Sequence, residues 1–458
     1  MSLYTSVNPA TGETLAEFDT FDDAGVERAL ATAQSGYEAW RDVPVTERAA
    51  VLTRISQAYD DRAEELATLM SREMGKPLRE AMGELKLCSM IWAWYAEHGP
   101  DLLGDETLQV PGADSTVVRR TPVGALLGIM PWNFPHYQVA RFAAPNLMLG
   151  NAILLKHAPI CPQSALVMEE LFRAAGVPEG AYQNVFASNE QAATMIADRR
   201  VQGVSLTGSE RAGAAVAEVA GRNLKKVVLE LGGSDAFIVL DDVDVDATVK
   251  AATRGRMSNT GQACNAAKRI VVLDAVYDEF VDKLAASFAA IVPGDPLVKG
   301  TVIGPLSSQA AADGLVKQVE TAVAQGATVL AGGERVDSPG AFVQPTVLAD
   351  VTPQMDAYSE ELFGPVAVVY RVKDADEAVA LANSSPYGLS GSVWSGDAAR
   401  AQQVAERLDV GMAFVNEHGT TLPGLPFGGV KRSGFGRELG SWGMDEFANR
   451  KLVRVSSR

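Results

Sequence analysis

Between Val123 and Leu231 the sequence alternates regularly between short strand-like runs and longer helix-like stretches, and this alternation constrains the fold more than any other feature. The expected strands are 126–130, 152–156, 182–186, 203–206 and 227–231, and the expected helices are 138–149, 163–175, 189–198 and 211–219. Such an order predicts a doubly wound, mostly parallel sheet. Sheets of this kind bind nucleotides beyond the carboxyl ends of their strands. Several polar side chains end or follow a predicted strand: Asn133, Lys156, Ser209 and Glu230.

The segment before this region has apolar residues at helical spacing. We expect helices over 24–40, 47–72 and 78–98. Thr46 is the expected N-cap of the second helix and Gly75 its stop signal. Pro77 suits the first turn of the third helix, where a missing N–H costs nothing.

A second alternating region runs from Ala236 to about Val415 and predicts a second α/β domain. Its strand-like pieces include 236–240, 269–273, 327–330 and 366–369. Thr116–Arg120 has the composition of a strand in a projecting arm. The tail Asn449–Val455 mixes basic and apolar residues, which suits a terminal strand that pairs with another subunit's edge.

Composition argues against several classes of protein. A formal net charge of −17 with no basic stripe argues against nucleic-acid binding. Cys88, Cys161 and Cys264 are far apart and the four histidines form no cluster, so we expect neither a disulfide framework nor a metal site. No apolar run is long enough to cross a bilayer, and Met1–Thr5 shows no secretory pattern. We expect a cytoplasmic protein with no membrane or nucleic-acid partner.

Cys264 and Glu230 carry the strongest chemical signal. Cys264 follows the small polar loop Asn259–Ala263, and Glu230 ends a β-branched run shortly before the pair Gly232–Gly233. A thiol can attack an electrophilic carbon, and a carboxylate can activate water to release the resulting acyl group. A lone cysteine is more often an inert, buried side chain, so the pair carries the hypothesis rather than either residue. No histidine lies near Cys264 in the sequence, so a Cys–His arrangement is not indicated.

Two loops have the pattern of a site around this pair. Pro131–Pro135 holds Asn133 between two prolines, where its amide can donate to a developing oxyanion; the alternative is that Asn133 only caps a turn. Leu206–Gly213 has the pattern of a strand, a glycine turn and a helix start, and a helix N-terminus favours a phosphate. Its glycines do not form G-x-G-x-x-G, so an ordinary strand-to-helix turn remains an alternative.

Six motifs occur in a fixed order: Pro131–Pro135 (PWNFP), Leu206–Ser209 (LTGS), Leu229–Gly233 (LELGG), Asn259–Cys264 (NTGQAC), Glu360–Pro365 (EELFGP) and Pro426–Lys431 (PFGGVK). Together they resemble the aldehyde dehydrogenase superfamily, and the resemblance extends from Asn8–Gly12 to the C-terminus. It implies an aldehyde dehydrogenase-like α/β fold and a homodimer or homotetramer. The implied parts are a Rossmann-type dinucleotide-binding domain over 1–103 and 122–231, a catalytic domain over 232–432, and a small β oligomerisation arm and tail over 104–121 and 433–458.

The resemblance also implies roles for individual residues. Cys264 would be the nucleophile, Asn133 and the Cys264 backbone N–H the oxyanion hole, and Glu230 the base that activates water. A thiolate is the reactive form, and a cationic nicotinamide nearby would favour it without a histidine. The residues expected at the cofactor are Trp132, Lys156, Pro159, Gly208, Ser209, Gly213, Leu231, Glu361 and Phe363. The residues expected at the aldehyde are Phe134, Arg141, Thr421 and Phe427.

Within the superfamily the chain is most similar to bacterial short-type succinate-semialdehyde dehydrogenases. The phrases Leu154–Ala158, Leu229–Asp235 and Cys264–Arg269 carry this similarity. It implies NAD(P)-dependent oxidation of succinate semialdehyde to succinate through a cysteine thiohemiacetal and a thioester.

Arg141 gives the substrate class a physical basis. It lies eight residues after Asn133, where a guanidinium can take a substrate carboxylate bidentately. Thr421 would add a hydroxyl. The alternative is that Arg141 pairs with a structural carboxylate. Some relatives place a second arginine where this chain has Ser258, and Arg256 is two positions off, so other small or ω-carboxy aldehydes are alternative substrates.

The choice of cofactor depends on the residues after Lys156. NAD-selective members of the superfamily place a glutamate three residues on, which binds the ribose 2′-hydroxyl and repels a 2′-phosphate; here that residue is Pro159. Lys156, with His157 as a second candidate cation, remains to attract a phosphate. We expect NADP to be favoured, with NAD as the alternative.

Two rival functions belong to other classes. One is a cofactor-binding scaffold without turnover, and the other is a thiol hydrolase acting on esters. The presence of Cys264, Glu230 and Asn133 together argues against the scaffold. An increase in the absorbance of reduced nicotinamide that requires an aldehyde would distinguish a dehydrogenase from both of these classes.

Overall fold

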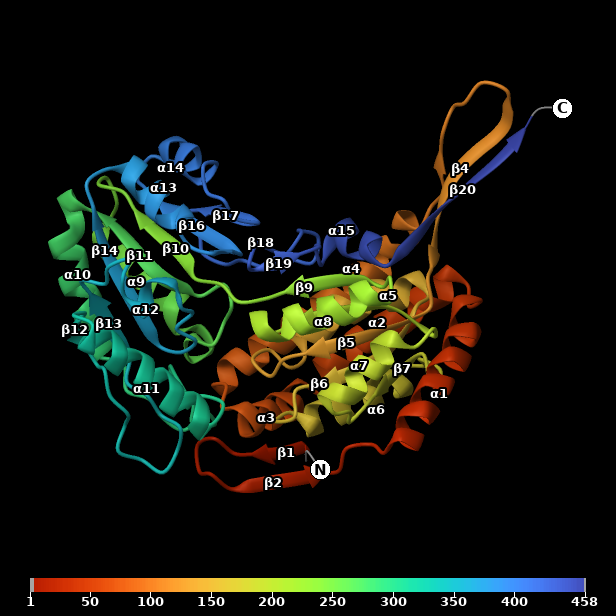
Figure 1. Cartoon of the computed structure of the whole chain (residues 1–458), viewed down its shortest axis with the longest axis horizontal. Helices are drawn as coiled ribbons and strands as arrows, with labels where there is room; N and C mark the ends of the chain where they lie inside the picture. Colours follow the sequence, from red (N-terminus) through yellow and green to blue (C-terminus); the bar gives the residue numbers. More distant parts are fainter. Residues whose placement is uncertain (1–3, 457–458) are drawn as a thin grey trace.

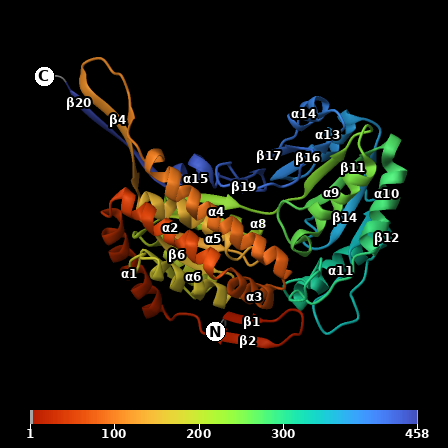
Figure 2. The same cartoon turned by 180° about the vertical axis from the view of Figure 1, so that it is seen from behind.

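The computed structural model describes residues 4–456 and contains two α/β bodies with a β arm that projects from one of them (Figures 1 and 2). Residues 1–3, part of the segment in which no secretory signal was expected, and residues 457–458 of the expected tail lie outside the described range. Within that range, none of the helices combines the length and the apolar character that a bilayer span requires.

The first body is built on a six-stranded sheet with the order β19-β9-β8-β5-β6-β7. Its strands are β5 (Ala125–Met130), β6 (Ala152–His157), β7 (Tyr182–Asn184), β8 (Val201–Thr207), β9 (Lys226–Glu230) and β19 (Gly434–Phe435). The connecting helices are α5 (Tyr137–Leu149), α6 (Pro162–Ala174), α7 (Asn189–Ala197) and α8 (Glu210–Arg222). Strands β5 to β9 pair in parallel, which confirms the predicted doubly wound sheet.

Strand β19 was not expected in this sheet. It runs antiparallel to β9, with Gly434 opposite Glu230. Part of the 433–458 segment, which we expected in the arm and tail, therefore closes the first sheet. This places the C-terminal segment directly against the carboxyl end of β9, where Glu230 lies.

The helices of the N-terminal segment pack against the first body. It contains β1 (Tyr4–Val7), β2 (Thr14–Phe18), α1 (Asp23–Arg41), α2 (Val45–Asp61), α3 (Ala63–Met74) and α4 (Leu78–Leu102). The prediction of a single helix over 47–72 is wrong, because the backbone turns at Arg62 (φ −107°, ψ 15°) and separates α2 from α3. The guanidinium of Arg62 holds this turn through ion pairs with Glu65 and Glu170.

Three predicted helix boundaries have different outcomes. Thr46 is not the N-cap of α2, because Pro44 takes that position and Thr46 falls in the first turn. Gly75 ends α3 in the left-handed conformation (φ 82°), as predicted. Pro77 lies one residue earlier than expected, as the N-cap of α4.

The second body is built on a seven-stranded sheet with the order β12-β13-β14-β11-β10-β16-β17. Its strands are β10 (Asp235–Val239), β11 (Ala267–Leu273), β12 (Thr328–Ala331), β13 (Thr346–Ala349), β14 (Val366–Val372), β16 (Ser390–Trp394) and β17 (Met412–Val415). Its main helices are α9 (Val245–Met257), α10 (Asp274–Ala289), α11 (Gln309–Ala324), α13 (Ala375–Asn383) and α14 (Ala398–Ala405). All neighbours are parallel except β12 and β13, which confirms the second α/β region.

The arm is a three-stranded sheet of β3 (Glu106–Thr107), β4 (Ala113–Pro122) and β20 (Ala448–Ser456). The tail is a strand, as expected, but it pairs antiparallel with β4 of its own chain. The other edge of β20 is open, and Leu452 and Val455 on this strand are exposed. The arm extends well beyond the first body (Figure 1).

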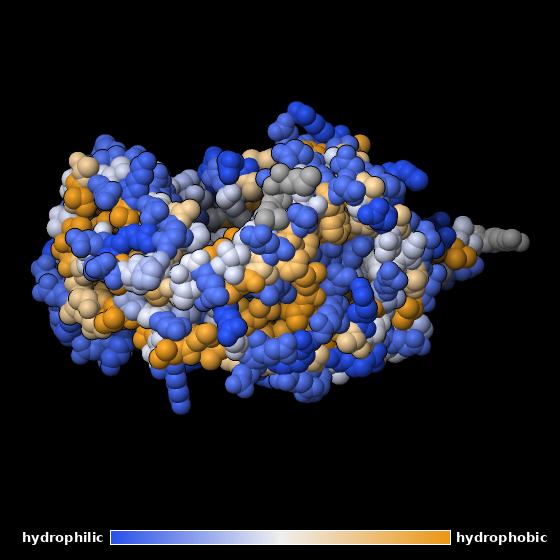
Figure 3. All heavy atoms as spheres, turned by 90° about the horizontal axis from the view of Figure 1, so that it is seen from below, coloured by the Kyte–Doolittle hydropathy of each residue, from blue (hydrophilic) through white to orange (hydrophobic). Residues whose placement is uncertain are grey.

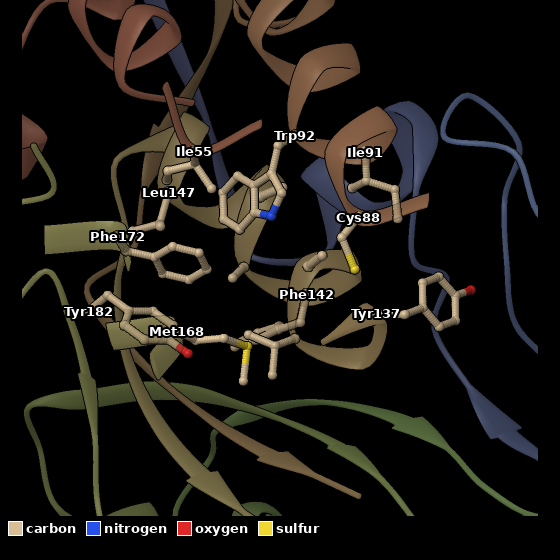
Figure 4. Close-up of a cluster of buried hydrophobic side chains, with 14 of the residues drawn as sticks. Ile55, Cys88, Ile91, Trp92, Tyr137, Phe142, Leu147, Met168, Phe172 and Tyr182 are labelled. Atoms are coloured by element: carbon tan, nitrogen blue, oxygen red, sulfur yellow. The ribbon is translucent and has the colours of Figure 1, made fainter. Parts of the chain in front are cut away.

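Aromatic and aliphatic side chains fill the space between the first sheet and its helices (Figure 4). The ring of Phe172 packs against Trp92 and Tyr182 at centroid distances of 4.9 and 4.6 Å. Each fully buried side chain of this size contributes about 1.5–3 kcal/mol of transfer free energy, so this cluster fixes the helices that carry the site. The face in Figure 3 is hydrophilic along much of its rim, with hydrophobic residues gathered toward its middle.

Candidate active site

The segment before Cys264 has an unusual backbone. In η1 (Ser258–Gly261), Asn259, Thr260 and Gly261 all have positive φ, at 52°, 57° and 75°. Left-handed conformations are unfavourable for the two residues with side chains, so the surroundings must hold them. Asn259 Nδ2 donates to the Asn133 carbonyl at 2.8 Å, and the side chain of Asn259 thereby ties η1 to the loop after β5.

Arg256 also supports this segment. Its side chain is fully buried, and its guanidinium donates to the carbonyl oxygens of Gly261, Val366, Leu362 and Gly364. Arg256 therefore faces the backbone that carries the nucleophile segment. It does not supply the second arginine that some relatives place near the substrate.

Cys264 lines a cavity of about 810 Å³ between the two bodies. The same lining contains the four side chains expected at the aldehyde: Phe134, Arg141, Thr421 and Phe427. Burial raises the pKa of the Cys264 thiol to about 12, against the lowering effect of nearby Arg141 and Lys268 charges. The thiol is therefore protonated at neutral pH in the cofactor-free protein.

Asn133 lies in the loop between β5 and α5 and is 5% exposed. Its Nδ2 donates to the Gln262 carbonyl at 3.0 Å, two residues before Cys264. An amide nitrogen has two N–H groups. Among the described residues Asn133 Nδ2 has one acceptor, so its second N–H is left to serve a developing oxyanion. The pairing brings the amide of Asn133 next to the nucleophile segment.

Glu230 ends β9 and is 2% exposed. Among the described residues neither carboxyl oxygen has a hydrogen-bond partner, and the side chain packs so closely on Gly428 that a Cβ there would lie 2.7 Å from Oε1. Burial raises the pKa of Glu230 well above its ordinary value, with Arg141 opposing the shift and Glu438 adding to it. A buried carboxyl group without a partner is suited to take up a proton.

Arg141 is fully buried on α5 and forms an ion pair with Glu438. Its Nη1 donates to the Tyr137 hydroxyl at 3.2 Å, its Nη2 donates to Thr207 Oγ1 at 3.3 Å, and its guanidinium lies 4.1 Å above the Phe427 ring. This pairing with a structural carboxylate is the alternative considered from the sequence. Each terminal nitrogen keeps one further N–H, so the role of Arg141 toward a substrate carboxylate stays a prediction.

The carboxyl ends of β5 and β8 form the point at which the strand order of the first sheet reverses. Open parallel sheets bind nucleotides at this switch point. Ser209 is the N-cap of α8, and its hydroxyl accepts from Ala212 N. Gly213 on the same helix packs on Leu231, where an added Cβ would lie 2.6 Å from the leucine side chain. Gly213 thus lets the start of α8 pack closely against Leu231, just after β9.

Lys156 and His157 end β6 and differ in charge. Lys156 is 6% exposed, and burial lowers its pKa. Burial lowers the pKa of His157 to about 4; its Nδ1 accepts from Ala158 N and its Nε2 faces the Pro135 carbonyl at 3.0 Å. His157 is therefore neutral at pH 7, and the suggestion that it supplies a second positive charge beside Pro159 is wrong.

Glu361 and Phe363 reach the site from the second body. Glu361 Oε1 accepts from Gly233 N at 3.1 Å and pairs with Lys268 Nζ at 3.1 Å. The Phe363 ring meets Trp132 edge-on at a centroid distance of 5.8 Å. These contacts bring Glu361, expected at the nicotinamide ribose, and Phe363, expected against the nicotinamide, to the carboxyl end of the first sheet.

The sequence interpretation missed two charged residues of the site, Lys268 and Glu438. Lys268 lies in a phrase quoted only for its similarity to relatives, and a lysine four residues after a cysteine has no intrinsic signal. Glu438 lies in the segment that we assigned to the tail. Only the antiparallel pairing of β19 with β9 brings this segment to Glu230.

A thiol that lines the cavity, a buried carboxyl group with no hydrogen-bond partner among the described residues, and a helix start at the switch point of a parallel sheet fit one class: nucleotide-dependent enzymes that work through a cysteine. The chain belongs to the aldehyde dehydrogenase family, whose model matches residues 2–453.

The chain is also similar to particular members of that family. It is 59% identical over 452 residues to the succinate-semialdehyde dehydrogenase [NADP(+)] of Deinococcus radiodurans, covering 99% of this chain and 94% of that protein. It is 44% identical to the succinate semialdehyde dehydrogenase [NAD(P)+] Sad of Escherichia coli, covering 98% and 97% of the two chains. The crystal structure of a Streptococcus pyogenes succinic semialdehyde dehydrogenase with NADP+ superposes with a TM-score of 0.97 at 42% identity, covering 99% of this chain and 100% of that one.

Proposed function

We propose that this protein oxidises succinate semialdehyde to succinate, with NADP as the favoured cofactor and NAD as the alternative. The observation that carries the proposal is that Cys264 and Arg141 line one cavity, so an aldehyde bound there would meet both a thiol and a guanidinium. The similarity to relatives named for this activity over nearly their whole length supports the substrate.

The chemistry assigned to the protein begins at Cys264. Its thiolate attacks the aldehyde carbon, and the oxyanion of the thiohemiacetal accepts from the Asn133 amide and the Cys264 backbone N–H. A bound nicotinamide supplies the hydride acceptor. Glu230 then takes a proton from the water that hydrolyses the thioester on Cys264, and its raised pKa suits a base that must bind and later release that proton.

The residues at the switch point fit a dinucleotide. The start of α8 at Ser209 supplies backbone N–H groups for a pyrophosphate. A Cβ at Gly213 would collide with Leu231 and push this helix start away. Lys156 supplies a cation for a ribose or a 2′-phosphate. Glu361 would bind the nicotinamide ribose, with Phe363 and Trp132 against the ring. Pro159 places no carboxylate beside a 2′-phosphate, which favours NADP.

An anionic substrate must approach a protein of net charge −17, so local cations matter. Arg79, Lys250 and Arg254 are exposed residues that line the cavity together with Cys264. Glu80 also lines the cavity, but its carboxylate accepts a hydrogen bond from the Asn259 backbone N–H, which offsets part of its negative charge. This lining favours a substrate that carries a carboxylate.

We further propose that the protein is a cytoplasmic homodimer or homotetramer. The open edge of β20 and the exposed apolar side chains of the arm, Leu108, Val110, Leu452 and Val455, suit contact with a second copy. Light scattering of the purified protein would measure the number of copies, and a monomer would contradict this part of the proposal.

An aldehyde panel assayed with both cofactors tests the main proposal. Succinate semialdehyde should give the highest kcat/KM. Butanal should have a lower kcat/KM, mainly because its KM is higher. The alternative is a dehydrogenase with broader specificity for small or ω-carboxy aldehydes, which equal kcat/KM values across the panel would favour. A higher kcat/KM for NAD than for NADP would contradict the cofactor assignment.

A further inference from the structure

Lys268 is a buried cation that contacts both the backbone at Cys264 and the carboxylate of Glu361. It lies near the start of β11 with 2% of its side chain exposed. Its Nζ donates to the carbonyl oxygens of Ala263 at 2.8 Å and Cys264 at 2.7 Å, and pairs with Glu361 Oε1 at 3.1 Å. An ammonium group has three N–H bonds, so these three acceptors satisfy it.

Two glycines pack closely against this cluster. Gly233 lies against the Cys264 carbonyl and Gly232 against the Glu361 carboxylate, so closely that a Cβ at either position would collide with those oxygens. Gly233 N also donates to Glu361 Oε1. The strand end that carries Glu230, the nucleophile segment and the Glu361 carboxylate therefore meet at Lys268.

We propose that Lys268 is a positioning residue that holds the Cys264 segment and the Glu361 carboxylate in one fixed arrangement. By holding the Cys264 carbonyl, Lys268 orients the peptide that bears the nucleophile. By pairing with Glu361, it orients the carboxylate toward the cofactor and neutralises it beside the thiol. The inference rests on the proposed roles of Cys264 and Glu361 and adds the residue that connects them.

The charges around Cys264 make this role measurable. Arg141 on α5 and Lys268 on β11 favour the thiolate, whereas Glu361, in the loop before β14, and Glu230 on β9 disfavour it. Removing the Lys268 charge leaves Glu361 uncompensated next to the thiol. Removing Glu361 as well restores the local balance of charge.

The test is the pH profile of Cys264 alkylation by iodoacetamide in the cofactor-free protein, followed by mass spectrometry. Lys268→Met keeps the length of the side chain and should slow alkylation about three- to tenfold at pH 9, with the profile displaced to higher pH. Glu361→Gln alone should accelerate it. The double variant should return to within about twofold of the wild-type rate.

Arg269→Met is the matched control. Arg269 is the next residue on β11, is equally buried, and donates to the backbone carbonyls of Leu381 and Ala382 at the end of α13. Its loss removes a buried cation of the same kind and should leave the Cys264 profile unchanged. If Lys268→Met behaves like Arg269→Met, or if the double variant stays as slow as Lys268→Met, the assignment is overturned. Should Lys268→Met fail to fold, an unchanged rate in Glu361→Gln would overturn it equally.

Titration of NADP+ by protein fluorescence separates this inference from the proposed function. Lys268→Met and Glu361→Gln should each weaken binding, and the double variant should lose less than the product of the two losses. If Glu361→Gln binds NADP+ as tightly as wild type, the cofactor role of Glu361 fails. The alkylation rates still report on Lys268 in that case.

Discussion

Arg141 and Glu438 form a buried ion pair, and both charges act on Glu230. Arg141 therefore serves two carboxylates of the protein: it neutralises Glu438 directly, and its charge opposes the raised pKa of Glu230. A substrate carboxylate would be a third. Replacing Arg141 alone disturbs all of these interactions at once. Arg141 and Glu438 must therefore be replaced together to separate them.

Arg141→Leu should raise KM for succinate semialdehyde and also lower stability by about 3–5 kcal/mol, because Glu438 is left buried without its partner. Arg141→Leu/Glu438→Leu should recover most of the stability. If Arg141 binds substrate, the double variant still shows a KM increase for succinate semialdehyde that butanal does not share. Equal losses on both aldehydes would assign Arg141 a structural role alone. Denaturant unfolding and steady-state kinetics supply the two readouts.

Glu230→Gln should slow hydrolysis of the thioester by about 10²- to 10⁴-fold, because an amide cannot take a proton from water. Attack by Cys264 needs no base at this position, so a first turnover should survive. Rapid mixing should show a burst of reduced cofactor close to one per active site, followed by a slow phase. A variant with no burst would place Glu230 in the first half of the reaction.

The pH dependence of Cys264 follows from its pKa of about 12 in the cofactor-free protein. Because burial favours the neutral thiol, the thiolate appears only as pH rises toward this value. Alkylation of Cys264 should increase about tenfold per pH unit from pH 7 to 10. Cys88 and Cys161 are fully buried and serve as internal controls in the same mass spectra. A plateau below pH 8 would contradict the burial argument.

Gly261→Ala should destabilise the protein by about 2–4 kcal/mol and misplace the nucleophile. Gly261 has φ 75°, and a Cβ there would collide with the Gly364 carbonyl. Gly221→Ala is the control, since its Cβ would meet nothing within 4 Å on α8. The control should keep full activity and gain about 0.5–1 kcal/mol. Comparable activity in both variants would show that the backbone of η1 tolerates change.

Pro159→Glu should lower kcat/KM for NADP about tenfold relative to NAD, because a carboxylate beside the ribose repels a 2′-phosphate. Pro159→Ala removes the ring without adding charge and should leave the ratio within about twofold. The two ratios are measured with succinate semialdehyde at saturation. An unchanged ratio in Pro159→Glu would place the 2′-position away from this residue.

Much of the fold was predictable because local rules decide it. The alternation of segments predicted both parallel sheets, and Gly75 ended its helix as a glycine stop signal should. The break at Arg62 was not predictable, because the apolar spacing continues through it and the turn depends on an ion pair with the distant Glu170.

The two α/β regions, the family, and the choice of Cys264 and Glu230 as the thiol and carboxylate of the proposed reaction follow from the sequence alone. These depend on local periodicity and on motifs that are contiguous in the chain. The charges that lie beside each of these groups follow only from the way the chain folds. Glu438 lies beside Arg141 because β19 pairs antiparallel with β9, and Glu361, in the loop before β14, pairs with Lys268 on β11 of the same body. Burial is the main cause of the raised pKa values of Cys264 and Glu230. Charges that folding brings close modify these values, because charge interactions act through space.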